Sequence, residues 1–350
     1  MEPTIEHTGF LIIHTGQIGD NLLTTPVIRS IRKAKPHAYI AFLTTPSNYH
    51  VFTYNPYLDE IILLDKSMPA SEYTRFLLNL KKRRFNVVLD YLGNPRTAFI
   101  SWFSDAQQRI GYDLRLRKYA YNVVVKRDPE PKYSVDFKYD LLKPLGIKGD
   151  GYGLDLFIPD TADRFASEFI SSIRKEPVPL ITFSVVSRRA YKQWHPERFA
   201  RLGDMLIEKL GALLIMLWGP GEKNYVQQVM YLMKHKPLLS PQTPSIKELG
   251  AIIKHADMHI GNDNGVKHIA IAMNTPTVTI HGPSDPVSWE PPDSPLHMWI
   301  KKDVGCGKCI PRDCKFGLKC LDAIQPEEVL SLTCQLYERI KKAKTVETTL

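Results

Sequence analysis

Residues Asp257–Pro292, DMHIGNDNGVKHIAIAMNTPTVTIHGPSDPVSWEPP, contain the strongest indication of the fold. Their apolar pattern predicts a short strand at Met258–Ile260, a tight polar turn at Gly261–Gly265, a helix at Val266–Met273 and a second strand at Thr277–Ile280. Strand-helix-strand units of this kind build parallel sheets, and such sheets bind ligands where polar loops leave the carboxyl ends of neighbouring strands. The stretch therefore predicts an α/β fold with a ligand site in the C-terminal half.

The turn places Asp263, Asn264 and Gly265 at the start of the predicted helix. Unpaired backbone N–H groups and the positive end of the helix dipole attract anions there. We expect the N–H groups around Gly265 and Val266 to bind phosphate, and the ligand to be nucleotide-like. A carboxylate beside a diphosphate would repel it, so Asp263 is expected to organise the loop or to accept from a sugar hydroxyl; a helix cap is the alternative.

Composition bounds the class of protein. At 350 residues, with 43% hydrophobic and 24% charged residues, the chain fits a globular protein of two domains. It has no apolar run of the roughly 20 residues that span a bilayer. Glu2 and Glu6 stand where a signal peptide would be basic, so a cytoplasmic location is expected.

The net charge of +9 favours an anionic partner. No nucleic-acid-binding motif is visible, so nucleic acid is not the expected partner. The basic residues form four clusters, which are Arg29, Arg32, Lys33 and Lys35; Lys81–Arg84; Arg115, Arg117 and Lys118; and Arg188, Arg189 and Lys192. These clusters can also be ordinary solvated helix faces.

Apolar strands alternate with helices twice along the chain. The first series begins at Phe10–His14, and the second restarts at Leu180–Val185 after the break at Pro177–Pro179. We therefore predict an N-terminal domain at 1–176, a C-terminal domain at 177–325, and a C-terminal helix and tail at 326–350 that packs back on the N-terminal domain. Two similar α/β domains imply a ligand cleft between them.

The turn Gly16-x-x-Gly19-Asp20 joins the first strand to a helix predicted at Asn21–Lys33. Its glycines allow a tight turn and a close approach of backbone to ligand. The spacing is that of neither a dinucleotide fingerprint nor a P-loop. Asp20 is a candidate general base that takes a proton from a hydroxyl; its alternative role is a helix N-cap.

Three further polar positions are candidates for the ligand site. Lys192, with Ser187 and Arg188 on the same loop, is suited to neutralise a diphosphate leaving group, because a fixed cation stabilises the charge of the departing phosphate; an ordinary basic loop is the alternative. Glu222 is placed to accept from ribose hydroxyls or to favour the start of its own helix. His268 is either a site residue or a helix-packing histidine.

The cysteines gather in the last seventh of the chain. The loop at 306–320 contains four thiols, and Cys334 stands apart on a predicted helix. Four thiols in one loop suit a structural zinc, although the spacing is not that of a common zinc module and reduced structural thiols are the alternative. The loop is not expected to be catalytic. Its thiols are Cys306, Cys309, Cys314 and Cys320.

Taken together, the motifs resemble those of glycosyltransferase family 9, the bacterial lipopolysaccharide heptosyltransferases. The resemblance rests on an ordered set that spans almost the whole chain. Its members are Gly-x-x-Gly-Asp at 16–20, Lys-x-Trp-x-Pro-Glu-Arg-Phe at 192–199, Gly-Pro-Gly-Glu at 219–222, Gly-Asn-Asp-x-Gly-x-x-His-x-Ala-x-Ala at 261–272, Pro-Thr-Val at 276–278, Gly-Pro-Ser-Asp-Pro at 282–286 and Ile-x-Pro-Glu-Glu-Val at 324–329.

The resemblance implies a GT-B fold, two Rossmann-like domains facing across a cleft, with the acceptor on the N-terminal half and the nucleotide-sugar on the C-terminal half. It implies inverting, metal-independent transfer from ADP-L-glycero-D-manno-heptose to an anionic inner-core acceptor at the inner face of the membrane. Asp20 matches the base, Lys192 the diphosphate-binding lysine and Glu222 the ribose contact. The donor-site signature falls on Asp263, Gly265 and His268.

The chain also departs from the family pattern. Asn264 replaces the usual Ser or Thr, Lys267 occupies a small or apolar position, and His195 is inserted between Trp194 and Pro196. These departures leave the donor sugar and base open. The alternatives are another GT-B glycosyltransferase, a nucleotide-sugar 2-epimerase that needs no acceptor, and a non-catalytic anion-binding protein.

Overall fold

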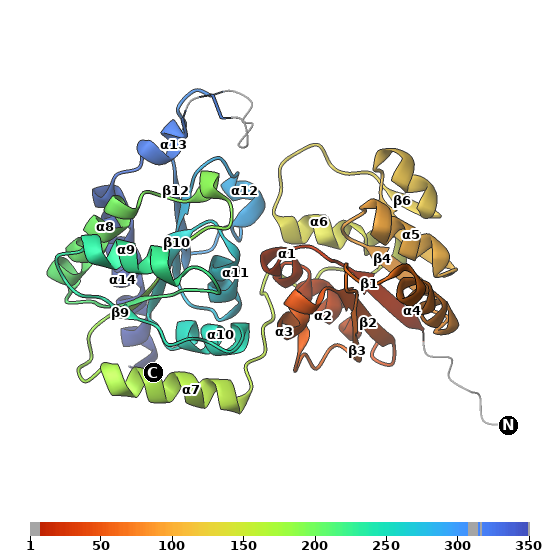
Figure 1. Ribbon diagram of the computed structural model, residues 1–350, viewed down its shortest axis with the longest axis horizontal. Coiled ribbons are helices and arrows are strands. Elements are labelled where there is room, and N and C mark those ends of the chain that lie inside the picture. The colour runs from red at the N-terminus through yellow and green to blue at the C-terminus, as the bar shows by residue number, and fades with distance from the viewer. Residues whose placement is uncertain (1–7, 307–313, 316, 349–350) are drawn as a thin grey trace. The chain divides into compact units, whose positions relative to one another are not determined.

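The computed structural model describes residues 8–306, 314–315 and 317–348. The chain forms two compact units, Met1–Phe157 and Ile158–Leu350, each built on its own six-stranded sheet (Figure 1). The division lies earlier than the boundary predicted at 176/177. Helix α7 (Asp160–Ile173) buries Ala162, Ala166 and Ile170 and packs on α10 (Ile246–Lys254), so its apolar stripe belongs to the second core.

The first unit has a parallel sheet in the order β3-β2-β1-β4-β5-β6. Helices α2 and α6 pack together, as do α4 and α5. The strands are β1 (Gly9–Ile13), β2 (Tyr39–Thr44), β3 (Glu60–Leu63), β4 (Val87–Asp90), β5 (Gln108–Tyr112) and β6 (Val123–Val125). The helices are α1 (Ile18–Leu22), α2 (Thr25–Ala34), α3 (Tyr49–Phe52), α4 (Ala70–Lys82), α5 (Pro95–Phe103) and α6 (Ser134–Asp140).

The second unit repeats this topology in the order β12-β11-β10-β7-β8-β9, again with parallel pairing. The strands are β7 (Leu180–Ser184), β8 (Leu213–Met216), β9 (Leu238–Leu239), β10 (Met258–Asn262), β11 (Thr277–His281) and β12 (His297–Lys301). The remaining helices are α8 (Pro196–Leu210), α9 (Lys223–Leu232), α11 (Gly265–Ala272), α12 (Pro286–Trp289), α13 (Lys319–Asp322) and α14 (Pro326–Thr348).

Both strand orders are the 3-2-1-4-5-6 order of a dinucleotide-binding fold. Central strands β1, β7, β10 and β11 are buried at every position, as expected for a parallel sheet covered on both faces. In such sheets the strand order reverses beside the first strand, and the crevice at the carboxyl ends there is the preferred ligand site. This switch point lies between β1 and β4 in the first unit and between β7 and β10 in the second.

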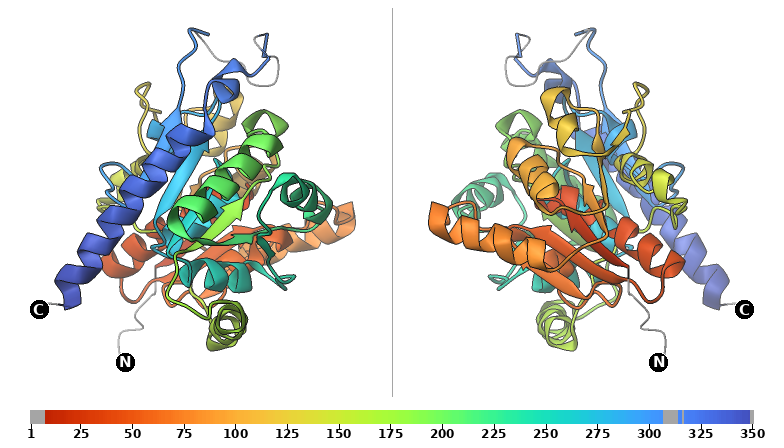
Figure 2. Two further views of the ribbon diagram at one scale, coloured as in Figure 1. Left: turned by 90° about the vertical axis from the view of Figure 1, so that its left-hand side faces the viewer. Right: turned by 90° about the vertical axis from the view of Figure 1, so that its right-hand side faces the viewer.

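Two expected elements differ in the structure. The helix predicted at Asn21–Lys33 is two helices, α1 and α2, because Pro26 lies in the first turn of α2, where its missing N–H is tolerated, and a new helix starts there. Helix α14, predicted to be separate from the C-terminal domain, runs beside α8 and contacts β11 and β12 (Figure 2, left). Its packing on the N-terminal domain stays a prediction. The helix buries Val329, Leu336 and other apolar residues in the second core and is part of that unit.

Candidate functional site

Two of the predicted site residues meet at the switch point of the second sheet. Lys192 lies on the loop after β7, and Asp263 follows β10, the neighbouring strand. The Lys192 ammonium donates to Asp263 Oδ2 at 2.6 Å. The Asp263 carboxylate is buried, whereas 22% of the Lys192 side chain is exposed. The predicted cation is therefore held at the carboxyl edge of the sheet, with one side towards solvent.

The two loops are joined by Asn262, a fully buried residue at the end of β10. Its side-chain oxygen accepts a hydrogen bond from the Trp194 backbone N–H at 2.9 Å, and its side-chain amide donates to the Val185 carbonyl at 2.9 Å. Trp194 is itself fully buried and packs edge-on against Phe199 at 5.0 Å between ring centroids. Lys192 is thus only two residues from a rigid anchor, which fixes the course of an otherwise polar loop.

Asn264 is the N-cap of α11. Its side-chain oxygen accepts from the Lys267 N–H at 3.1 Å, and its amide donates to the Val186 carbonyl at 2.9 Å and the Ser184 hydroxyl at 3.3 Å. The residue that departs from the usual Ser or Thr therefore keeps the capping function and adds a link to the neighbouring strand. Gly265 begins the helix, so its N–H lies in the first turn, where we expect phosphate to bind.

Replacing Asn264 with alanine is expected to lower the free energy of unfolding by about 1 kcal/mol through loss of the cap. The loss is larger if the two hydrogen bonds that the side-chain amide donates also contribute. In a unit of this size a loss of about 1 kcal/mol amounts to a decrease in the melting temperature of roughly 2–4 °C. Asn264→Ser, which retains a capping hydroxyl, is the matched control and should lose less. Equal melting temperatures for the alanine and serine variants would contradict the capping role of this side chain.

A buried ion network extends from Asp263. Lys267, one turn further along α11, donates to Asp263 Oδ1 at 3.1 Å and to Glu290 Oε1 at 3.0 Å. His281, at the end of β11, faces the same Glu290 oxygen at 2.6 Å. In the sequence Lys267 is visible only as a departure from the family pattern, and Glu290 and His281 are not visible as site residues, since no local pattern links Asp263 to a residue 27 positions away.

The network controls the charge of its acids. Burial by itself would raise the pKa of Asp263, but Lys267, His281 and Lys192 hold it well below its ordinary value. Burial would likewise raise the pKa of Glu290, and Lys267 and His281 lower it instead. Burial opposes the charge of Lys267, yet the two carboxylates raise its pKa. Both acids are therefore ionised and Lys267 is charged at neutral pH.

His268, the residue after Lys267 on α11, is a further predicted site residue. Its ring packs against Trp289 at 6.2 Å between centroids, and the Lys192 ammonium lies 5.4 Å from the centre of the same indole ring. Burial, followed by the Lys267 charge, holds the pKa of His268 well below its ordinary value, so the ring is neutral at neutral pH. His268 Nδ1 is buried and has no hydrogen-bond partner among the described residues. The contact with Trp289 supports a packing role for His268. A contact between His268 and the nucleotide-sugar stays a prediction.

Three predicted donor-site residues make no described contact with the ion network. Ser187 is buried and donates its backbone N–H to Gln193 at 3.0 Å, which closes the loop, whereas Arg188 is exposed. Glu222 accepts the Gly219 N–H at 2.8 Å and is the N-cap residue of α9, so its local role is to organise its own turn. Its expected contact with ribose remains a prediction.

In the first unit Asp20 lies at the carboxyl edge beside the switch point between β1 and β4. It is the third residue of α1 rather than its cap, which is Gln17, and its Oδ2 accepts the Gln17 N–H at 3.3 Å. Gly19 is buried within the same helix. At Gly16 a Cβ would come 2.5 Å from the His14 ring, so only glycine fits against it. The turn is therefore packed tightly, with Asp20 half-buried.

His14 and Lys138 adjoin this turn and were not identified from the sequence. The Gly16 N–H donates to His14 Nδ1 at 3.1 Å, so the ring proton lies on Nε2, which faces the Lys138 nitrogen at 3.1 Å. This arrangement fits an uncharged lysine amine. Burial, opposed by the charge of Asp20 and assisted by that of Arg127, lowers the pKa of Lys138 to about 8. An amine of adjustable charge therefore lies close to the predicted base.

Lys138→Met is expected to raise the melting temperature at pH 7. Because the folded-state pKa of Lys138 is about 8, below the ordinary value of 10.5, the folded protein binds this proton more weakly than the unfolded chain. The resulting destabilisation is fully present below pH 8 and disappears as the pH rises towards 10.5, and we expect it to be about 1–3 kcal/mol. Melting curves between pH 6 and 10.5 test this, and a variant less stable than the parent at pH 7 would contradict it.

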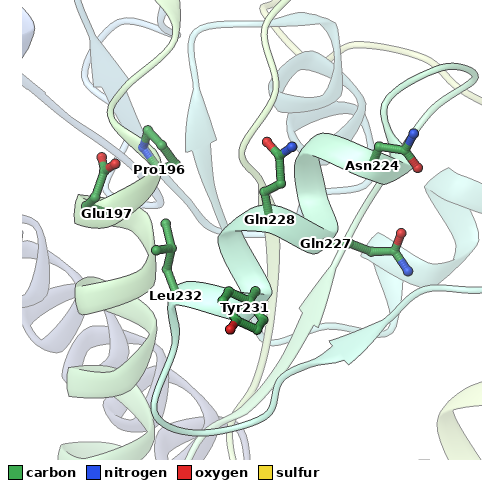
Figure 3. A pocket seen from close by; sticks show the side chains of 7 residues that line it. All are labelled: Pro196, Glu197, Asn224, Gln227, Gln228, Tyr231 and Leu232. Carbon is green, nitrogen blue, oxygen red and sulfur yellow. The ribbon is translucent and has the colours of Figure 1, made fainter.

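A surface hollow of about 580 Å³ is lined by none of these groups. It is formed between the start of α8 and the outer face of α9 (Figure 3). Its lining residues are Pro196, Glu197, Asn224, Gln227, Gln228, Tyr231 and Leu232. None of them is a predicted site residue, and polar side chains without a charged cluster give the hollow no chemistry. We therefore place the functional site at the strand edge and not in this hollow.

The predicted zinc loop is only partly described. Cys306, Cys314 and Cys320 are half-buried, and Cys309 lies outside the described residues. Within residues 8–306, 314–315 and 317–348 no group of three or more His, Cys, Asp or Glu side chains is placed to hold a metal ion. The zinc site stays a prediction. Among the same residues, no helix is both long and apolar enough to cross a bilayer.

Known proteins resemble the chain over most of its length. It is 24% identical over 290 residues to lipopolysaccharide heptosyltransferase 3 of Escherichia coli, which covers 78% of this chain and 83% of the relative. It is also 24% identical over 348 residues to lipopolysaccharide heptosyltransferase 1 of Campylobacter coli, which covers 93% of this chain and 98% of the relative.

Solved structures agree. A family 9 glycosyltransferase from Veillonella parvula matches with a TM-score of 0.85 and 25% identity, covering 95% of this chain and 98% of that one. The E. coli ADP-heptose lipopolysaccharide heptosyltransferase II matches with a TM-score of 0.76 and 18% identity, covering 95% and 99%. These likenesses and the two parallel sheets confirm the predicted GT-B fold. The sequence profile of glycosyltransferase family 9 (heptosyltransferase) matches residues 73–319, and the chain belongs to this family of glycosyltransferases.

Proposed function

We propose that the protein transfers a heptose from ADP-L-glycero-D-manno-heptose to an inner-core sugar of lipopolysaccharide, with inversion at the anomeric carbon. The observation that carries the proposal is the Lys192–Asp263 pair at the switch point of the second sheet, beside the first turn of α11. Family membership supports heptosyl transfer, and ADP-heptose is named for the E. coli enzyme with the same fold.

In the proposed reaction the Asp20 carboxylate takes the proton of an acceptor hydroxyl. The hydroxyl oxygen forms a bond to the anomeric carbon, while the bond from that carbon to the diphosphate oxygen breaks and its electron pair leaves with ADP. Negative charge grows on the departing oxygen, and the Lys192 ammonium together with the first N–H groups of α11 stabilises it. No divalent ion takes part in this scheme. The scheme assigns the donor to the second unit and the acceptor to the first.

The donor is tested by calorimetric titration with ADP, UDP, GDP and ADP-heptose in EDTA. Selective, metal-independent binding of ADP and ADP-heptose is the expected result. Preference for another nucleotide would replace the donor and keep the reaction class. The absence of nucleotide binding would contradict the proposal and favour an anion-binding role. Conversion of donor in the absence of any acceptor would instead indicate a 2-epimerase.

The acceptor class follows from charge and from the relatives. Two curated relatives are named heptosyltransferases 1 and 3, so the position of the added heptose is to be found by a screen of truncated lipopolysaccharide cores. The net charge of +9 suits a phosphorylated or carboxylated core on an acidic inner-membrane surface. Cosedimentation with acidic but not neutral vesicles, decreasing as salt rises, tests the membrane part of this proposal.

A further inference from the structure

We infer that Lys267 is a positioning residue for the donor site: it compensates the charge of Asp263 when Lys192 leaves that carboxylate to bind the donor diphosphate. The inference rests on the proposed function of Lys192.

The first argument is the different availability of the two lysines. The Lys267 side chain is 1% exposed, and its ammonium donates to Asp263 Oδ1 at 3.1 Å, to Glu290 Oε1 at 3.0 Å and to the Trp289 carbonyl at 2.8 Å. These acceptors match its three hydrogens. Lys192 is 22% exposed and, among the described contacts, donates to Asp263 Oδ2 alone. Lys267 is thus fully engaged, whereas Lys192 retains two hydrogens for a ligand.

The second argument is electrostatic. The Asp263 carboxylate holds one lysine on each oxygen, Lys192 on Oδ2 and Lys267 on Oδ1. If Lys192 turned to a diphosphate and no other cation were present, Asp263 would be a buried, uncompensated carboxylate close to a second negative charge. Such a charge costs several kcal/mol, which would oppose donor binding. With Lys267 in place the Asp263 carboxylate stays paired. The movement of Lys192 to the diphosphate then leaves no buried charge without a partner.

The third argument concerns the aromatic side of the site. By holding the Trp289 carbonyl and Glu290, Lys267 fixes the segment after β11 to the first turn of α11. The Trp289 ring lies against both Lys192 and His268. One buried ammonium therefore joins the first turn of α11 to the segment after β11, and it is too buried to contact the donor itself.

The test is a cycle of four proteins titrated with ADP in EDTA: the parent, Lys267→Met, Asp263→Asn and the double variant. We expect Lys267→Met to weaken ADP binding at least tenfold, because Asp263 then competes with the diphosphate for Lys192. The double variant should recover to within about threefold of Asp263→Asn alone, because it leaves no uncompensated acid at position 263. Lys254→Met, which breaks a half-exposed pair with Asp163 in the same unit, is the matched control and should bind ADP like the parent.

Thermal melts of the same proteins at pH 7 give a readout that needs no ligand. Lys267→Met should lower the melting temperature, and Asp263→Asn should restore part of the loss. If Lys267→Met is unfolded, the double variant decides: a folded double variant that binds ADP supports the inference, and an unfolded or non-binding one overturns it. Parent-like affinity in a folded Lys267→Met, or a double variant no better than the single one, also overturns it. Failure of the parent to bind ADP counts against the proposed donor, while the melts still report on charge compensation.

Discussion

Asp20→Ala is expected to abolish sugar transfer while ADP binds as before. The carboxylate lies at the switch point of the first sheet, and its proposed role is to take the acceptor proton; loss of a general base lowers the rate by roughly 10²–10⁴-fold. The ligand-binding groups assigned to the donor belong to the second unit. We therefore expect kcat to fall and the dissociation constant of ADP to stay within twofold of the parent value.

Asp20 also accepts the Gln17 N–H in the first turn of α1, so part of any loss has a structural origin. Glu72→Ala removes an exposed acid from the first turn of α4 in the same unit, and it is the control for the loss of a negative charge from a first helical turn. Asp20→Asn keeps the size of the side chain and removes its basicity, so it should be as inactive as the alanine variant. Turnover above a tenth of the parent rate in either Asp20 variant would refute the assignment of the base.

Lys192→Met should have the second-largest effect, this time on both donor binding and kcat. The ammonium lies at the carboxyl edge of the second sheet with 22% of its side chain exposed, and loss of a group that stabilises the leaving oxygen lowers the rate by roughly 10²–10³-fold. The variant is expected to fold, because Asp263 keeps its pairing with Lys267. Titration with ADP and steady-state kinetics separate the binding loss from the rate loss.

The control for Lys192 is Arg189→Ala, an exposed basic residue on the same loop. If the loop acts only through its general positive charge, both variants should weaken ADP binding to a similar extent and salt should mask the effect in both. If Lys192 has the proposed specific role, its loss should be at least tenfold greater and should persist at high salt. An unchanged kcat in Lys192→Met would exclude a role in stabilising the leaving group.

Much of the fold could be predicted because parallel strands that are buried on both faces consist of short runs of apolar residues in the sequence. Strands β10 and β11 begin at the predicted residues, Met258 and Thr277. The division between units could not be predicted in the same way. Helix α7 precedes the Pro177–Pro179 break, yet its apolar stripe packs on α10, some 80 residues later, and such a pairing leaves no mark in the local pattern.

Local patterns in the sequence were enough to predict the two α/β units, the polar turns at Gly16–Asp20 and Gly261–Gly265, and the acid and lysine proposed for the chemistry, because turn residues and alternating apolar runs act over a few positions. Which charges meet depends on the tertiary fold. The pairing of Lys192 with Asp263, the burial of Lys267 between Asp263 and Glu290, and the contact of His14 with Lys138 join segments 71, 23 and 124 residues apart. Ionisation depends on burial and on such neighbours, so the state of these groups is a property of the folded chain.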